Sequence, residues 1–93
     1  MANTASAKKR ARQAQKRYLR NKAHRSRVRT VVRKVLRAIE AGNLELAREA
    51  YRQAVPVIDS MVNKGILHKN NAARKKSRLS ARLKALALAQ QAS

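Results

Sequence analysis

The chain has 93 residues, of which 24 are Lys or Arg and four are Asp or Glu, so its formal net charge is +20 at pH 7. The absence of cysteine excludes disulfides and thiolate metal sites, and no apolar run approaches the roughly 20 residues that a membrane-spanning helix needs. So dense a positive charge repels itself until a polyanion neutralises it, which makes nucleic acid the expected partner.

The composition favours helix throughout, since the chain has two Gly and one Pro and is rich in Ala, Leu, Lys and Arg. No linker divides it, so residues 1–93 are predicted to form a single domain. A core without Phe or Trp must be made of Val, Leu, Ile, Ala and Met. Such a small domain is marginally stable alone, and we expect a partner to stabilise it.

The first predicted helix begins near Asn3 and continues to Ala41, because no helix breaker precedes Gly42. Its second half carries an apolar stripe, formed by Val28, Val31, Val32, Val35, Leu36 and Ile39. Residues 1–27 have mostly Ala at their apolar positions. We therefore expect them to form an arm that projects from a bundle of residues 28–93 and stays frayed until it binds.

A run of positive charge covers most of this helix. Lys or Arg occupies fourteen of the thirty positions from Lys8 to Arg37, and no acid lies among them. Two ladders repeat every four residues, at Lys8, Arg12, Lys16, Arg20, Arg25, Arg29, Arg33 and Arg37. Like charges at this spacing oppose a lone helix by roughly 0.2 to 0.5 kcal/mol per pair. A merely solvated helix intersperses acids, so the run predicts a nucleic-acid interface.

The second predicted helix follows at once, with Gly42 ending the first and Asn43 capping the next. Pro56 falls on its outer face, where it bends a helix instead of ending it. The inner face comprises Leu44, Ala47, Ala50, Tyr51, Ala54, Ile58, Met61 and Val62. All four acids lie in or just before this segment, at Glu40, Glu45, Glu49 and Asp59. This helix should therefore face away from the polyanion.

Gly65 ends the second helix, and Ile66 is placed to pack back on it. A short polar connector follows, with Asn70 or Asn71 as the expected cap of the third helix. The apolar line of that helix comprises Ala72, Leu79, Leu83, Leu86 and Ala87. Three amphipathic helices with short loops can bury their stripes only against one another. The predicted fold is all-α, an antiparallel three-helix bundle with an extended N-terminal helix projecting beyond it.

Catalysis finds little support in the sequence. The few acids point outward, and His24 and His68 lie far apart without carboxylate companions. No glycine-rich phosphate loop exists, because Gly42 and Gly65 are isolated helix ends. We therefore predict no enzyme, no cofactor, no metal and no small-molecule substrate.

Single-strand binding by base stacking needs exposed aromatic side chains, and Tyr18 and Tyr51 are the only two aromatics in the chain. Tyr51 lies on an apolar face, so stacking is not the expected mechanism. Two rival functions remain: a nucleoid-type protein that compacts DNA, and a cationic membrane-active helix at Val28 to Ile39. Burial of that stripe in the bundle is the favoured alternative to membrane binding.

Several segments resemble one family. They are Met1-Ala2-Asn3 with Ser6-Ala7-Lys8-Lys9-Arg10, Ala38-Ile39-Glu40-Ala41-Gly42, Pro56-Val57-Ile58-Asp59, Lys64-Gly65-Ile66-Leu67-His68-Lys69-Asn70, Ala72-Ala73-Arg74 and Lys76-Ser77-Arg78-Leu79. Over nearly the whole chain they resemble bacterial ribosomal protein number twenty of the small subunit. The segment from Gly65 to Leu79 is the most specific.

This resemblance implies a three-helix protein at the bottom of the small subunit that binds small-subunit ribosomal RNA early in assembly. It implies contacts with the 5′ domain and the long penultimate helix of that RNA, few protein contacts and no membrane. The implied location is the cytoplasmic ribosome of a bacterium, and a plastid ribosome is also compatible.

The expected RNA-binding residues form two groups. In the first helix they are Lys8, Lys9, Arg10, Arg12, Lys16, Arg17, Arg20, Lys22, Arg25, Arg27 and Arg29. At the second junction they are His68, Lys69, Asn70, Arg74, Lys75, Lys76, Ser77 and Arg78. The cations neutralise phosphates, whereas Asn70 and Ser77 can donate hydrogen bonds that fix the register.

Overall fold

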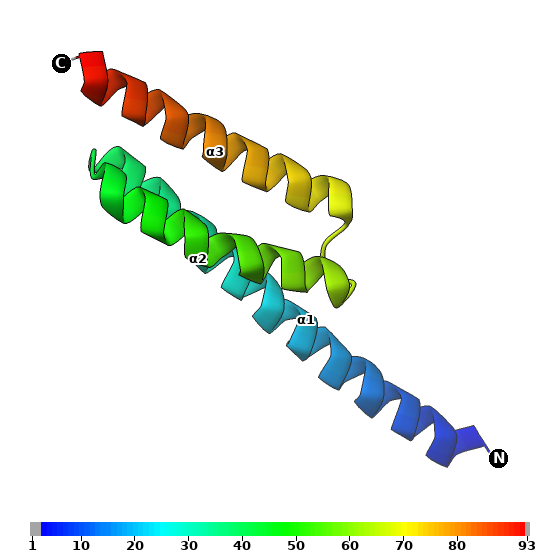
Figure 1. Ribbon diagram of the computed structural model, residues 1–93. Helices are drawn as coiled ribbons and strands as arrows, with labels where there is room; N and C mark the ends of the chain where they lie inside the picture. The colour runs from blue at the N-terminus through cyan, green and yellow to red at the C-terminus, as the bar shows by residue number, and fades with distance from the viewer. Residues whose placement is uncertain (1–2, 93) are drawn as a thin grey trace.

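The computed structural model describes residues 3–92, which form three helices and no strand (Figure 1). They are α1 (Asn3–Glu40), α2 (Leu44–Asn63) and α3 (Lys69–Ala92). α2 runs back along the second half of α1, and α3 runs back along α2 (Figure 1). The predicted all-α bundle with a long first helix is confirmed. Met1 and Ala2, which carry part of the family resemblance, lie outside the described residues.

The core is built from small side chains, as the composition predicted. Its buried residues are Val28, Val35, Ala38, Ala47, Ala54, Ile58, Met61, Ala72, Leu79 and Leu83. Four of these ten are alanines, and the largest fully buried side chains are Ile58, Met61 and Val35. Alanine lets helices approach closely but removes little apolar surface from water. The bundle therefore buries little apolar surface in relation to the positive charge that it carries.

Both predicted glycine ends are confirmed. Gly42 and Gly65 have φ angles of 73° and 74°, in the left-handed region that residues with a Cβ rarely adopt. After α2, the Ile66 N–H donates to the carbonyl oxygen of Met61 at 2.9 Å, and Ile66 packs against the core. Asn43 caps α2 as predicted, because its side-chain oxygen accepts from the Leu46 N–H at 3.1 Å.

The predicted cap of α3 is wrong. Asn70 and Asn71 lie inside the first turn of α3, which begins at Lys69. His68 takes the cap position: its Nδ1 accepts from the Asn70 N–H at 3.1 Å, and its carbonyl oxygen accepts from the Ala72 N–H at 3.1 Å. Asparagine is the better cap by local preference. The loop fixes the start of the helix two residues earlier.

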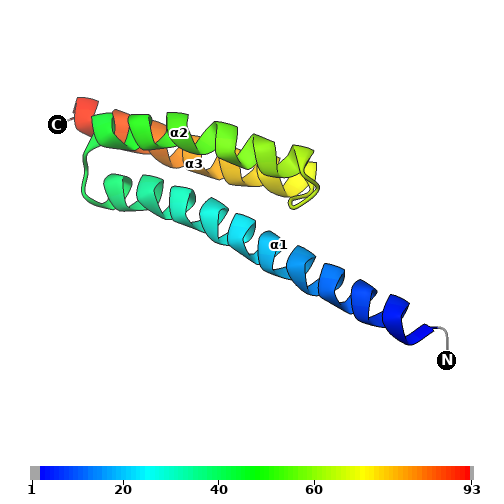
Figure 2. The same cartoon turned by 90° about the horizontal axis from the view of Figure 1, so that it is seen from below.

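The N-terminal half of α1 extends beyond the bundle (Figure 2). All side chains from residue 4 to residue 20 are exposed, and Val28 is the first buried residue of α1. The radius of gyration is 18.8 Å, whereas a compact domain of this length has one of about 12 Å. Figure 2 shows α1 continuing far beyond the loop between α2 and α3. The projection is thus a single uninterrupted helix whose second half belongs to the bundle.

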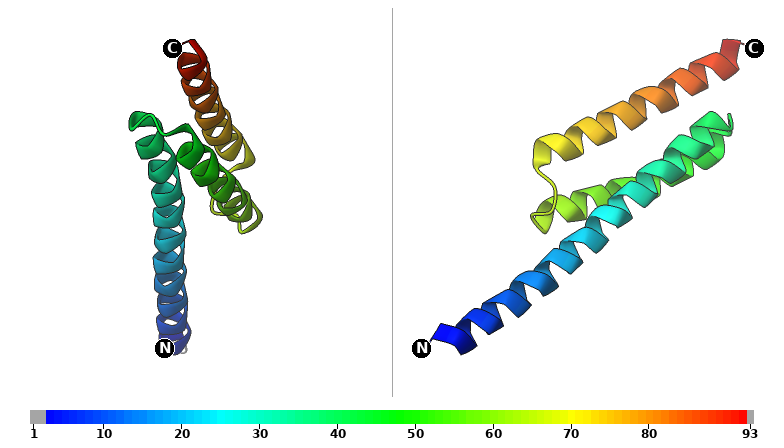
Figure 3. Two further views of the ribbon diagram at one scale, coloured as in Figure 1. Left: turned by 60° about the vertical axis from the view of Figure 1, so that its left-hand side comes forward. Right: turned by 180° about the vertical axis from the view of Figure 1, so that it is seen from behind.

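α3 is attached mainly to α2. The Tyr51 hydroxyl donates to the carbonyl oxygen of Lys76 at 3.3 Å, and the Lys76 ammonium pairs with Asp59 at 2.7 Å. At the other end the Gln90 amide donates to the carbonyl oxygen of Gly42. Contacts between α1 and α3 are the sparsest in the bundle, and the two helices diverge towards the start of α3 (Figure 3).

Candidate nucleic-acid interface

The three helices differ sharply in charge. α1 carries fourteen Lys or Arg residues and the single acid Glu40, and α3 carries seven Lys or Arg residues and no acid. α2 carries three acids, Glu45, Glu49 and Asp59, and only two arginines. α2 thus has a net charge close to zero and packs against two strongly positive helices.

The fourteen cations of α1 are exposed and form no ion pair within residues 3–92. The ion pairs of the described chain both use an acid of α2: Glu49 pairs with Arg52 at 3.4 Å, and Asp59 pairs with Lys76 at 2.7 Å. The positive charge of α1 is therefore available in full to an external anion.

The first predicted group lies entirely on this free surface. All eleven residues from Lys8 to Arg29 are exposed, and in the arm they occupy every side of the helix. Tyr18 is also exposed, with 64% of its surface accessible, and borders a hollow with Lys22 and Arg25. The arm therefore presents one aromatic ring among many cations, whereas Tyr51 is half-buried against the core as predicted.

The second predicted group is less uniform. Six of its members are exposed, namely His68, Lys69, Asn70, Arg74, Ser77 and Arg78. Lys75 and Lys76 are half-buried. The Lys76 ammonium is held by Asp59, so this lysine joins α3 to α2. His68 uses Nδ1 to cap α3.

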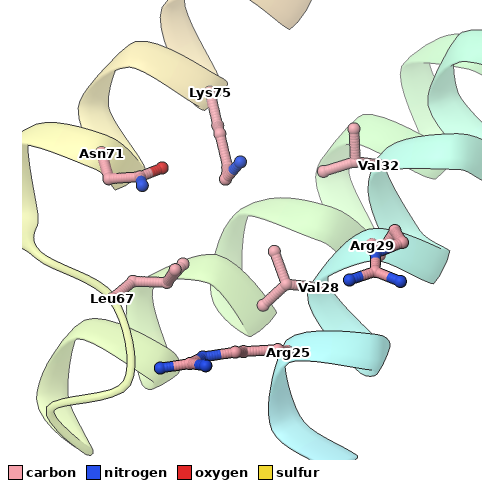
Figure 4. A pocket seen from close by; sticks show the side chains of 7 residues that line it. All are labelled: Arg25, Val28, Arg29, Val32, Leu67, Asn71 and Lys75. Atoms are coloured by element: carbon pink, nitrogen blue, oxygen red, sulfur yellow. The ribbon is translucent and has the colours of Figure 1, made fainter. Parts of the chain in front are cut away.

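The structure brings members of the two groups together in one place, the α1–α3 hollow. Its lining comprises Arg25, Val28, Arg29, Val32, Leu67, Asn71 and Lys75. Figure 4 shows Lys75 and Asn71 reaching from α3 towards the valines of α1, with Arg25 along the lower edge beside Leu67. Residues up to fifty positions apart in the sequence therefore share one basic surface.

A second hollow lies where the arm passes the loop between α2 and α3. This arm–loop hollow is lined by Arg17, Arg20, Asn21, His24, Lys64, Gly65 and Ile66. Five of these residues were not among the predicted site residues: Asn21, His24, Lys64, Gly65 and Ile66. Asn21 and His24 are half-buried and continue the stripe of Val28 at helical spacing, a signal that the sequence contains.

The described residues contain no cluster of three His, Cys, Asp or Glu side chains that could hold a metal ion. None of the helices in residues 3–92 is both long enough and apolar enough to cross a bilayer.

The fold and this surface define a class, the small and strongly basic all-α proteins whose cations face outward. Within that class, the family described as Ribosomal protein S20 matches residues 2–84 of this chain. The chain belongs to this family, as the resemblance predicted, and the family is one of ribosomal proteins and not of enzymes.

Relatives named small ribosomal subunit protein bS20 match the chain over nearly its whole length. The one from Methylococcus capsulatus is 64% identical over 88 residues, which are 95% of this chain and 96% of the relative. The one from Thioalkalivibrio sulfidiphilus is 63% identical over 92% of this chain and 100% of the relative. A third, from Pseudomonas aeruginosa, is 60% identical over 96% of this chain and 98% of the relative.

Proposed function

We propose that this chain is a structural component of the small ribosomal subunit, in a bacterial cytoplasm or a plastid, that binds small-subunit ribosomal RNA directly and assists its assembly. Family membership and the names of the relatives support the ribosomal assignment. The observation that carries direct RNA binding is the set of fourteen exposed cations on α1 that lack an acid partner within the described residues.

The mechanism is phosphate neutralisation. Each Lys or Arg that meets a phosphate releases condensed counterions, which drives binding and makes it depend on salt. RNA helices that must pack together repel one another, and a cationic rod between them lowers that repulsion. For the protein, the same contacts relieve the repulsion along the Lys8 to Arg37 run.

Specificity comes from shape more than from base identity, because the deep major groove of A-form RNA is too narrow for side chains to read. The bundle fixes the angle between the basic surfaces of α1 and α3. The eleven predicted residues of α1 contact backbone phosphates, and those at the start of α3 add phosphate and ribose contacts. Few other proteins are contacted.

The chain divides functionally into the arm, residues 1–27, and the bundle, residues 28–93. The arm makes few tertiary contacts, since its side chains from residue 4 to residue 20 are all exposed. Its helix is consequently stabilised against fraying when RNA neutralises its charge. The bundle supplies a preformed surface that positions the arm.

Nuclease footprinting of small-subunit ribosomal RNA, with and without the protein, tests this function. We expect a few discrete protected segments that disappear as salt is raised. Excess duplex DNA should compete poorly. Displacement of the RNA by DNA one for one would instead support a DNA-compacting protein, and leakage from anionic vesicles at low protein concentration would support a membrane-active helix.

A further inference from the structure

The α1–α3 hollow has an unusual charge arrangement. Two guanidinium groups, of Arg25 and Arg29, come from α1, and the ammonium of Lys75 comes from α3. No acid lines the hollow, and the Asn71 amide provides a neutral polar group. Like charges on facing helices repel each other, so this opening is electrostatically strained until an anion enters.

The floor of the hollow is apolar. Val28 is only 4% exposed, and Val32 and Leu67 are half-buried beside it. An ion pair above such a floor is surrounded by less water, and its attraction is screened less. The hollow has a volume of about 250 Å³, below the roughly 300 to 1,000 Å³ of pockets that enclose a small-molecule ligand. It suits one charged group of a larger partner.

The position of the hollow adds a mechanical consequence. α3 is tied to α2 by the Lys76–Asp59 ion pair and the Tyr51 hydrogen bond, whereas α1 and α3 have the sparsest contacts in the bundle. An anion held by cations of both helices would supply the missing connection. The side of the bundle where α1 and α3 face each other is thus the side on which one bound anion would add most to the contacts between two helices.

We propose that the α1–α3 hollow binds one backbone phosphate of the RNA, held jointly by Arg25, Arg29 and Lys75, and that this phosphate ties α3 to α1. The inference rests on the proposed function. Arginine offers a planar fork that can donate two hydrogen bonds to one phosphate, and lysine adds a mobile point charge. Asn71 contributes a neutral donor.

Shared binding makes the cations interdependent. When either Arg25 or Lys75 is removed, the phosphate loses its bridge and the remaining cation loses much of its contact. The effects of the two changes on affinity should then combine to less than their product. Two cations that meet different phosphates should give effects that multiply.

A double-mutant cycle on the full chain tests the proposal. The affinity of a small-subunit ribosomal RNA transcript is measured for wild type, Arg25→Gln, Lys75→Gln and the double variant, with helicity checked by circular dichroism. Each single change should weaken binding about tenfold, and the double change by less than about 30-fold. The matched control pairs Arg25→Gln with Lys84→Gln, an exposed lysine of α3 outside the hollow, for which the effects should multiply.

Multiplicative effects for Arg25 and Lys75, in a wild type that binds the RNA with strong salt dependence, would overturn the shared phosphate and leave the proposed function intact. A wild type that does not bind the RNA would overturn both. Equal coupling in the control pair would also refute the proposal, because the coupling would then reflect net charge alone.

Discussion

The two halves of α1 form one continuous helix with similar densities of Lys and Arg, yet they occupy different environments. From Val28 onward the helix buries one face against α2 and α3, while side chains 4–20 are exposed on every side. The difference lies in the apolar stripe, which only the second half possesses. Apolar side chains thus decide where this helix docks, and its positive charge is left to an external partner.

The transition between the halves is gradual. Asn21 and His24 continue the stripe of Val28 and are half-buried beside the loop at Lys64 to Ile66. Their polar side chains contribute less hydrophobic stabilisation than valines would at the same positions. This part of the arm therefore touches the bundle without being anchored by it.

Replacing a fully buried core residue should have the largest effect, which is a loss of stability. Ile58 is fully buried, so Ile58→Ala should lower the free energy of unfolding by about 2 to 5 kcal/mol. This loss is enough to unfold a bundle with so small an apolar core. Thermal denaturation followed by circular dichroism measures the change. Leu46→Ala, at a position that is 55% exposed, is the control and should alter stability by less than about 0.5 kcal/mol. Equal losses would contradict the assignment of the core.

Removing charge from the arm should weaken RNA binding without affecting the bundle. The variant carries Gln in place of Lys8, Arg12, Lys16 and Arg20. Its affinity for small-subunit ribosomal RNA should fall about 100-fold, and the slope of log affinity against log salt should decrease by roughly three. The melting transition of the bundle in the free protein should not move, because these four exposed side chains belong to the arm and not to the packed core.

The control for this charge removal neutralises four cations outside the predicted interface. They are Arg48, Arg52, Arg82 and Lys84, all of which are exposed. A clearly smaller loss of affinity is expected. If both variants lose the same affinity, net charge and not position governs binding.

Hydrogen exchange should separate the two halves directly. Amides of residues 8–25 should show little protection in the free protein, because no packed core resists their opening, while amides near Ile58 should be protected up to the global stability. Binding of small-subunit ribosomal RNA should raise protection in the arm by at least about tenfold. Strong protection of the arm before RNA is added would refute folding on binding.

The smallest expected effect distinguishes two neighbouring cations of α3. Lys76 pairs with Asp59, and this pair is partly exposed, so Lys76→Gln should lower stability by less than about 1 kcal/mol. Arg78 is exposed and unpaired among the described residues, so Arg78→Gln should leave stability unchanged and weaken RNA binding more than Lys76→Gln. Denaturation and affinity measured on both variants check the two effects. The reverse order of affinities would show that Lys76 leaves Asp59 to bind RNA.

The sequence alone predicted the three helices, both glycine ends and the Asn43 cap, because each depends on residues within one or two turns of one another. It also predicted the core face of α2, since burial follows helical spacing once a partner exists. The cap of α3 was mispredicted as Asn70 or Asn71. His68 holds that position because the loop leaving Gly65 sets where the third helix can begin.

What the sequence determined by itself was the local geometry of the helices and the excess of positive charge over the acids. Only the tertiary structure decided which cations are available to an external anion and which are held by an acid of another helix. Lys76 pairs with Asp59 across two helices, and Lys75 lines one hollow with Arg25 and Arg29 on the open side of the bundle. Both arrangements depend on the distances between packed helices, and the periodic pattern of a sequence carries no information about those distances.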